Sequence, residues 1–178
     1  MTTPSGVFQE ANGLVVMEAE NATWNLRRGS KVWLEQSNLS GYAGEGYLTA
    51  FADTGLLVEP TAVITSSELQ FTVNFTTTGV YTLWLRGYAP DGAGDSLYLG
   101  LANQGAVTPT ILTGFVPQQW HWSKIETSNG VAILDITQPG LHTLHLWQRE
   151  DGLRLDRLLL TTDSGYTPPE MARPKASK

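Results

Sequence analysis

The sequence predicts an all-β fold, a β-sandwich of the jelly-roll type in a single domain. Two observations favour it. Short runs of residues alternate between apolar and polar side chains, and turn-forming clusters separate the runs, in keeping with 18 Gly and 9 Pro among 178 residues. No window of a dozen residues has the apolar spacing of a long helix. A chain of this length also fits a single hydrophobic core.

The clearest predicted strand spans residues 69–75, whose alternation gives one buried and one solvated face. A Thr-Thr-Gly turn follows, and a second strand is expected at 80–86. We interpret this pair as a hairpin. Further strands are expected at 14–20, 32–35, 46–51, 96–101, 131–137, 141–149 and 153–161.

The domain boundaries follow from composition. We expect a lead segment at 1–13, the sandwich at 14–163, and a linker or disordered tail at 164–178, where proline and charged residues accumulate.

Charge and composition exclude several classes of function. The net charge of −6, without a local cluster of Lys and Arg, argues against nucleic acid as a partner. No stretch approaches the roughly 18 apolar residues of a membrane span. The first residues do not resemble a signal peptide, so a secretion signal of the parent protein is expected outside this segment. The absence of cysteine excludes disulfides and leaves the compartment open.

Three carboxylates form the first candidate site. Glu18 and Glu20 are two apart in a predicted strand and therefore project from the same face, where they offer hard oxygen ligands to calcium. Asp156 lies within the last predicted strand, where an unpaired buried charge is costly. The alternative is that the two glutamates are solvated and that Asp156 pairs with Arg157 or Arg154.

Aromatic residues form the second candidate site. Trp120 and Trp122 share a strand face after a Pro-Gln-Gln turn, and exposed indoles there would stack on sugar rings. The alternative is that one or both belong to the core.

A polar turn supplies the third candidate. Arg149, Glu150 and Asp151 lie between two apolar strands, where a guanidinium and two carboxylates could bond sugar hydroxyls. A solvated hairpin tip is the alternative. The sequence contains no phosphate-binding loop, nucleophile elbow or dinucleotide fingerprint, so we expect no catalytic residues.

An ordered series of motifs resembles β-sandwich carbohydrate-binding modules of families 6 and 35. The series comprises Glu-Ala-Glu-Asn at 18–21, the glycine-rich segment 40–48, Gly-Val-Tyr through Arg86 at 79–86, Trp-His-Trp at 120–122, Gly-Leu-His-Thr-Leu at 140–144 and Gly-Leu-Arg-Leu-Asp at 152–156. The resemblance covers about residues 14 to 163.

The resemblance implies a structural calcium held by Glu18, Glu20 and Asp156, with backbone carbonyls of loop 37–41. It implies a sugar site in the loops at one end of the sandwich, with Tyr42 and Trp120 or Trp122 as the aromatic platform. Arg86 and the loop before the last strand would provide the polar contacts.

Two positions depart from the family pattern. The last loop reads Arg149-Glu150-Asp151-Gly152 where these modules often place an asparagine, and the Trp-His-Trp spacing is tighter than the usual W-x-x-W.

These inferences lead to one main hypothesis and two alternatives. The main hypothesis is a non-catalytic module of a larger secreted protein, which directs an attached enzyme or adhesin to a polysaccharide. The first alternative is a structural or protein-adhesion sandwich whose aromatic residues are all core. The second is a small jelly-roll glycosidase or lyase.

Overall fold

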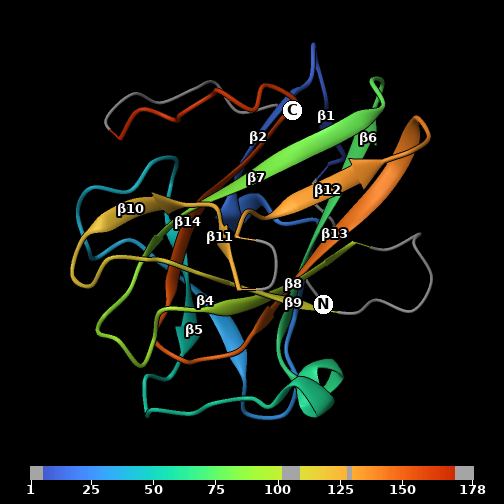
Figure 1. The fold of residues 1–178 in the computed structure, drawn as a ribbon. Helices are drawn as coiled ribbons and strands as arrows, with labels where there is room; N and C mark the ends of the chain where they lie inside the picture. Colours follow the sequence, from blue (N-terminus) through green and yellow to red (C-terminus); the bar gives the residue numbers. More distant parts are fainter. Residues whose placement is uncertain (1–5, 102–108, 128–129, 171–178) are drawn as a thin grey trace.

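The computed structural model describes residues 6–101, 109–127 and 130–170, and in these ranges two sheets of seven strands each pack into one sandwich (Figure 1). The predicted all-β, single-domain fold is confirmed. Within the same residues, no helix is long and apolar enough to cross a membrane.

Sheet A contains, in hydrogen-bonded order, β1 (Phe8–Gln9), β6 (Glu68–Phe75), β13 (Gly140–Gln148), β8 (Leu97–Leu101), β9 (Thr110–Thr113) and β11 (Ile125–Glu126), with β3 (Trp24–Leu26) also paired to β6. Sheet B contains β10 (Trp120–Ser123), β7 (Gly79–Tyr88), β14 (Arg154–Thr161), β5 (Tyr47–Phe51) and β4 (Val32–Gln36), with β12 (Ile133–Ile136) paired to β7 and β2 (Leu14–Glu18) paired to β14. Two short 3-10 helices, η1 (Ala19–Asn21) and η2 (Pro60–Thr65), complete the elements of the described residues.

The core lies between the two sheets because the strands of each sheet direct apolar side chains to the face that meets the other sheet. In β6 these are Leu69, Phe71, Val73 and Phe75, and β7 contributes Tyr81, Leu83 and Leu85 from the other sheet. Burial of apolar side chains of this size is the main stabilising term of such a sandwich.

The predicted hairpin of residues 69–75 and 80–86 is wrong. Both segments are strands, but β6 pairs with β13, whereas β7 pairs with β10, β12 and β14. The turn between them therefore crosses from one sheet to the other. An alternating strand followed by a tight turn fits both arrangements, and here each strand directs its apolar face to the common core.

Strand β14 carries the irregularity that shapes the outer face of sheet B. Its pairing with β7 shifts register between Leu155 and Arg157, which marks a β-bulge. Leu155 and Leu158 both point into the core, so Asp156 and Arg157 both lie on the opposite face. A regular strand would place these two neighbours on opposite faces.

Glu10 anchors the turn where the chain crosses between the sheets. Its buried carboxylate accepts hydrogen bonds from the backbone N–H groups of Gly13, Thr76 and Thr77 and from the Thr76 hydroxyl. Burial alone would raise the pKa of Glu10, but these hydrogen bonds outweigh it and hold the pKa below the ordinary 4.5. Glu10 lies in the predicted lead segment, yet it fixes the crossover.

Glu10→Gln should therefore lower the free energy of unfolding at pH 7 by about 1 to 3 kcal/mol. The NH₂ group of the glutamine amide is a donor and cannot accept the hydrogen bonds that the replaced carboxylate oxygen accepts. Urea unfolding measures this loss. The folded-state pKa is depressed, so the wild-type advantage is complete above about pH 4.5 and shrinks as the pH falls through the folded pKa. Glu59→Gln, at an exposed position before η2, is the control, and an equal loss in both variants would contradict the anchoring function.

Candidate functional site

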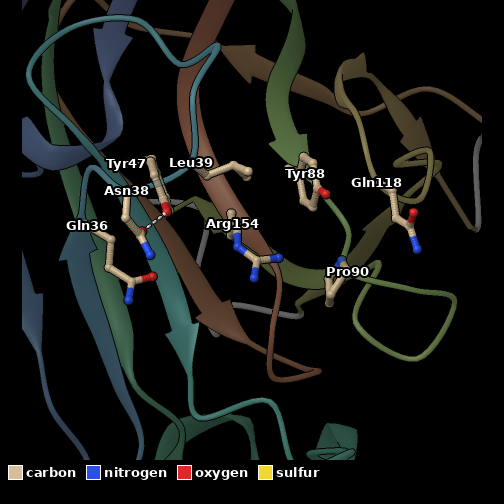
Figure 2. A pocket seen from close by; sticks show the side chains of 8 residues that line it. All are labelled: Gln36, Asn38, Leu39, Tyr47, Tyr88, Pro90, Gln118 and Arg154. Atoms are coloured by element: carbon tan, nitrogen blue, oxygen red, sulfur yellow. Dashed lines mark hydrogen bonds between the residues drawn. The ribbon is translucent and has the colours of Figure 1, made fainter.

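A pocket of about 340 Å³ opens at one end of sheet B. Eight residues line it: Gln36, Asn38, Leu39, Tyr47, Tyr88, Pro90, Gln118 and Arg154. Figure 2 shows Arg154 in the middle, with Gln36 and Asn38 on one side and Tyr88, Pro90 and Gln118 on the other.

The order of strands in sheet B assembles this pocket from distant parts of the chain. Gln36 ends β4, Tyr47 begins β5, Arg154 begins β14 and Tyr88 ends β7. Gln118 lies in the turn before β10 with a positive φ of 62°. Because β4, β5, β14, β7 and β10 are neighbours in that order, the strand ends that carry these residues lie side by side at one end of the sheet.

The pocket presents groups that recognise hydroxyl and carboxylate oxygens. The guanidinium of Arg154 lies 5.1 Å from the ring centroid of Tyr88, a cation–π contact. Its Nη1 atom is buried, and no residue of the described chain accepts a hydrogen bond from it. The Tyr47 hydroxyl donates to Asn38 Oδ1 at 2.6 Å, and Thr49 donates to Gln36 Oε1 at 2.6 Å, so both amides are held in place.

Trp120 packs beside the pocket and connects three of the predicted site residues. Its ring contacts Tyr47 and Tyr88, with centroid distances of 5.3 and 5.6 Å, and the Arg86 guanidinium lies 5.5 Å from it. Tyr42 in turn contacts Tyr47 at 5.5 Å. Tyr42 and Trp120 therefore pack against residues that line the pocket, whereas Arg86 and Trp120 themselves line a second pocket of about 400 Å³ together with Gly41 and Gln119.

Trp122 lies apart from this group. It is buried against Val16, Trp84 and Leu159 on the outer face of sheet B, and Tyr166 packs against the same cluster. Part of the predicted tail thus packs on sheet B, since Tyr166 joins this cluster. Three further residues of the tail line a pocket with Trp84 and Trp122: Thr167, Pro168 and Glu170. Residues 171–178 lie outside the described part of the chain.

Arg149 and Glu150 are engaged with the neighbouring loop. Arg149 donates to Ser96 Oγ and to Glu150 Oε1, both at 2.6 Å, and its guanidinium lies 6.0 Å from the centroid of Tyr98. Glu150 accepts from the Ser96 hydroxyl at 2.6 Å and from the backbone of Asp95 at 3.1 Å. These contacts fix the turn between β13 and β14.

Asp151 holds a second loop. Its carboxylate is buried and accepts hydrogen bonds from the backbone N–H groups of Thr54, Gly55 and Leu56 and from the Thr54 hydroxyl, at 2.7 to 3.0 Å. Burial raises its pKa, but these hydrogen bonds outweigh burial and lower the pKa below its ordinary value. Asp151 therefore orders residues 54–56 against the turn between β13 and β14.

The three predicted calcium ligands lie together, and arginines hold two of them. Asp156 is fully buried, receives the backbone N–H of Ala43 at 2.8 Å and pairs with Arg86 Nη1 at 2.5 Å. Glu18 is buried in a two-point ion pair with Arg157. The alternative interpretation of the sequence is therefore not observed: Asp156 pairs with Arg86 and not with Arg157 or Arg154, and Glu18 is buried and not solvated.

Glu20 is the member of this cluster that lacks an arginine. Its Oε1 accepts the backbone N–H of Glu45 at 3.0 Å, while its Oε2 is buried with no partner among the described residues. Burial, reinforced by the charges of Glu18 and Asp156, raises the pKa of Glu20 to about 7. Gly44 packs directly on both glutamates, and its φ of 66° suits glycine.

The chemistry of this donor set fits a hard divalent cation, because three carboxylates meet and one buried oxygen lacks a partner. In the present side-chain arrangement, however, the described residues contain no group of three acidic, His or Cys side chains set to hold a metal ion. The reason is visible in the contacts, since Arg86 and Arg157 bond Asp156 and Glu18.

Comparison with known proteins assigns the chain to a family. The model of the glycosyl hydrolase family 115 C-terminal domain matches residues 7–170. The chain belongs to this family. The family 115 C-terminal domain described here is 25% identical to uncharacterized protein P23 of Formosa agariphila, over 94% of this chain and 48% of P23. The chain thus spans about half the length of that relative.

Solved structures of similar fold are carbohydrate-binding modules of families 35 and 6, which confirms the resemblance seen in the sequence. The family 35 module of Paenibacillus barcinonensis has a TM-score of 0.56 and 19% identity, over 84% of this chain and 99% of that one. The GH26-CBM35 β-(1,4)-mannanase of Podospora anserina has a TM-score of 0.56 and 21% identity, over 89% of this chain and 29% of that one. At these identities the likeness concerns the fold.

None of the eight residues that line the pocket is among the sugar-binding residues predicted from the sequence. Arg154 and Tyr88 are paired across β14 and β7, yet in the sequence they are ordinary polar and aromatic residues at strand ends. The available signal was position, because Gln36, Tyr47, Tyr88 and Arg154 all stand at strand ends of one sheet. That signal requires the strand order, which local patterns do not give.

We expect Asp151→Asn to loosen the loop formed by residues 54–56. The amide cannot accept all four hydrogen bonds, so the backbone amides of Thr54, Gly55 and Leu56 should exchange with solvent roughly tenfold faster or more. Hydrogen exchange followed by NMR measures each amide, and the amides of Ala62 in η2 and of Ser66 at its C-terminal cap serve as an internal control. Unchanged protection at 54–56 would show that Asp151 does not order this loop.

Proposed function

We propose that this family 115 C-terminal domain is a non-catalytic module that binds carbohydrate in the pocket around Arg154. The observation that carries the proposal is the buried, unpartnered Nη1 of Arg154, whose guanidinium lies over Tyr88 in a pocket that also contains three amides and a second phenol. Sugars are bound in proteins by such planar polar groups together with an aromatic surface. The fold shared with carbohydrate-binding modules supports the proposal.

The pocket favours an acidic sugar over a neutral one. Arg154 supplies a rigid fork of N–H donors that matches a carboxylate or sulfate group, and Arg86 lies next to the same aromatic cluster. We therefore propose a uronate-rich or sulfated polysaccharide as the ligand. Tyr42 and Trp120 pack against residues that line the pocket, and Arg86 lines the second pocket, while Trp122, Arg149, Glu150 and Asp151 contribute packing and loop anchoring.

A module of this kind acts by concentrating its neighbours. Held on a polymer, it raises the effective concentration of an attached enzyme or adhesin without tight binding of its own. P23 of Formosa agariphila extends well beyond the matched region, which supports covalent neighbour domains in the parent of this chain. A polysaccharide ligand further supports a secreted parent protein.

Arg154→Met should abolish retention on the polysaccharide while preserving the fold. Loss of a charged, forked hydrogen bond costs about 1.5 to 3 kcal/mol, which weakens binding roughly ten- to a hundredfold. Affinity electrophoresis through gels containing neutral, uronate-rich or sulfated polysaccharides measures the effect. Arg27→Met, at an exposed position remote from the pocket, is the matched control and should migrate like the wild type.

Each other outcome of this experiment points elsewhere. Equal retardation of wild type and Arg154→Met would place the ligand outside the pocket. Free migration of the wild type through all the gels would favour the structural or protein-adhesion function. New reducing ends or unsaturated products released by the domain would identify a glycosidase or lyase.

We also propose that Glu18, Glu20 and Asp156 hold a structural calcium ion. The buried, unpartnered Oε2 of Glu20 supports this assignment. A divalent cation would neutralise the repulsion among the three carboxylates and add stability through binding only to the folded state.

Calcium at about a hundredfold its dissociation constant should stabilise the domain by about 2.7 kcal/mol, and a chelator should remove this gain. Thermal unfolding with added calcium chloride or EGTA measures the shift in Tm. Glu20→Gln should abolish the shift, whereas Glu35→Gln, at an exposed position in β4, should retain it. A wild-type Tm that does not change with calcium would show that the arginines alone neutralise the negative charge of the three carboxylates.

A further inference from the structure

The ion pair between Arg157 and Glu18 occupies both oxygens of a proposed calcium ligand. Arg157 Nε donates to Glu18 Oε2 at 2.8 Å, and its Nη2 donates to Glu18 Oε1. Both side chains are buried, with exposed fractions of 6% for Arg157 and 8% for Glu18. A cation that uses Glu18 must therefore displace, at least in part, a buried two-point hydrogen-bonded pair.

The bulge in β14 gives Arg157 this position. It turns Arg157 to the outer face of sheet B beside Asp156, opposite Glu18 of β2. Burial by itself lowers the pKa of Arg157, but the hydrogen bonds and charge of Glu18, followed by the charges of Asp156 and Glu20, raise it overall. The positive charge of the guanidinium thus interacts with all three carboxylates, as the charge of a bound cation would.

Arg86 does not have the same position. It bonds Asp156 and also donates to the backbone carbonyl of Gly41 at 3.1 Å, so it ties the cluster to a loop. Glu18 and Glu20 instead converge on Gly44, where a Cβ atom would lie 2.3 Å from Glu20 Oε1 and 3.2 Å from Glu18 Oε2. Arg157 is therefore the cation that bonds Glu18, next to the arginine-free Glu20.

We propose that Arg157 is an internal counter-cation that competes with a divalent cation for Glu18 and thereby sets the affinity of the carboxylate cluster for that cation. This inference rests on the calcium part of the proposed function. Arg157 keeps the cluster folded without metal, and its release is the cost of binding metal. The competition is a property of the two residues and does not depend on carbohydrate.

Titration of the purified domain with calcium chloride, followed by calorimetry, tests the competition. Arg157→Met removes the guanidinium and retains an apolar stem. It should bind calcium about tenfold more tightly than the wild type or better, the factor that corresponds to a charged hydrogen bond of modest strength. The double variant Glu18→Gln/Arg157→Met should lose this gain, and Arg27→Met should bind like the wild type.

The outcomes separate the competition from the calcium proposal. Binding by Arg157→Met but not by the wild type supports complete competition and overturns calcium in the wild-type domain. Equal affinities in both proteins overturn the competition and retain the calcium site. Absence of binding in both overturns the two together.

A second variant covers the case in which Arg157→Met does not fold without metal. Folding of that variant upon addition of calcium supports the competition. If it remains unfolded, Arg157→Lys decides, because lysine keeps the charge but lacks the two-point fork. Tighter calcium binding by Arg157→Lys than by the wild type supports the proposal, and equal or weaker binding overturns it.

Discussion

The bulge at Leu155–Arg157 in β14 is the constraint on which the polar half of this molecule depends. Strand β14 lies in the middle of sheet B, between β7 on one side and β2 and β5 on the other. The bulge turns two consecutive charged residues, Asp156 and Arg157, to one face. Each then meets a partner of opposite charge from a neighbouring strand, Arg86 from β7 and Glu18 from β2.

Burying four charges on one sheet face does not by itself stabilise a fold, because desolvation offsets much of the attraction within each pair. In this sheet the two ion pairs specify how the strands align. Removing any one member would leave an uncompensated buried charge, which is strongly destabilising, so the pairs fix the register of β2, β7 and β14. The third acidic residue, Glu20, has no arginine partner, and its pKa, raised to about 7 by burial and by the neighbouring carboxylates, distinguishes the cluster from a fully paired structural network.

Alternation and turn residues predicted the sandwich and most of its strands, because the apolar faces of β6 and β7 are visible in the sequence. Whether those two strands pair was not predictable, since strand order depends on contacts between distant segments. The predicted strand face shared by Glu18 and Glu20 is wrong, because β2 ends at Glu18 and Glu20 lies in η1. The two carboxylates nevertheless converge on Gly44, and Arg157 was not recognised as the partner of Glu18. That pairing requires a bulge, and a one-residue irregularity leaves no periodic signal. Arg154 was missed because its importance comes from the strand ends around it.

Loop 37–45 links the charge cluster to the pocket. Asp156 receives the N–H of Ala43, Arg86 and Trp120 donate to the carbonyls of Gly41 and Ser40, and Tyr47 donates to Asn38. The first two anchors belong to the cluster, whereas Asn38 at the other end of the loop lines the pocket. The loop cannot shift at one end without straining contacts at the other, because its polar groups are satisfied by fixed strands. The pairing of Arg86 with Asp156 therefore also holds the loop that forms one wall of the pocket, so the charge cluster and the shape of the pocket depend on a single loop.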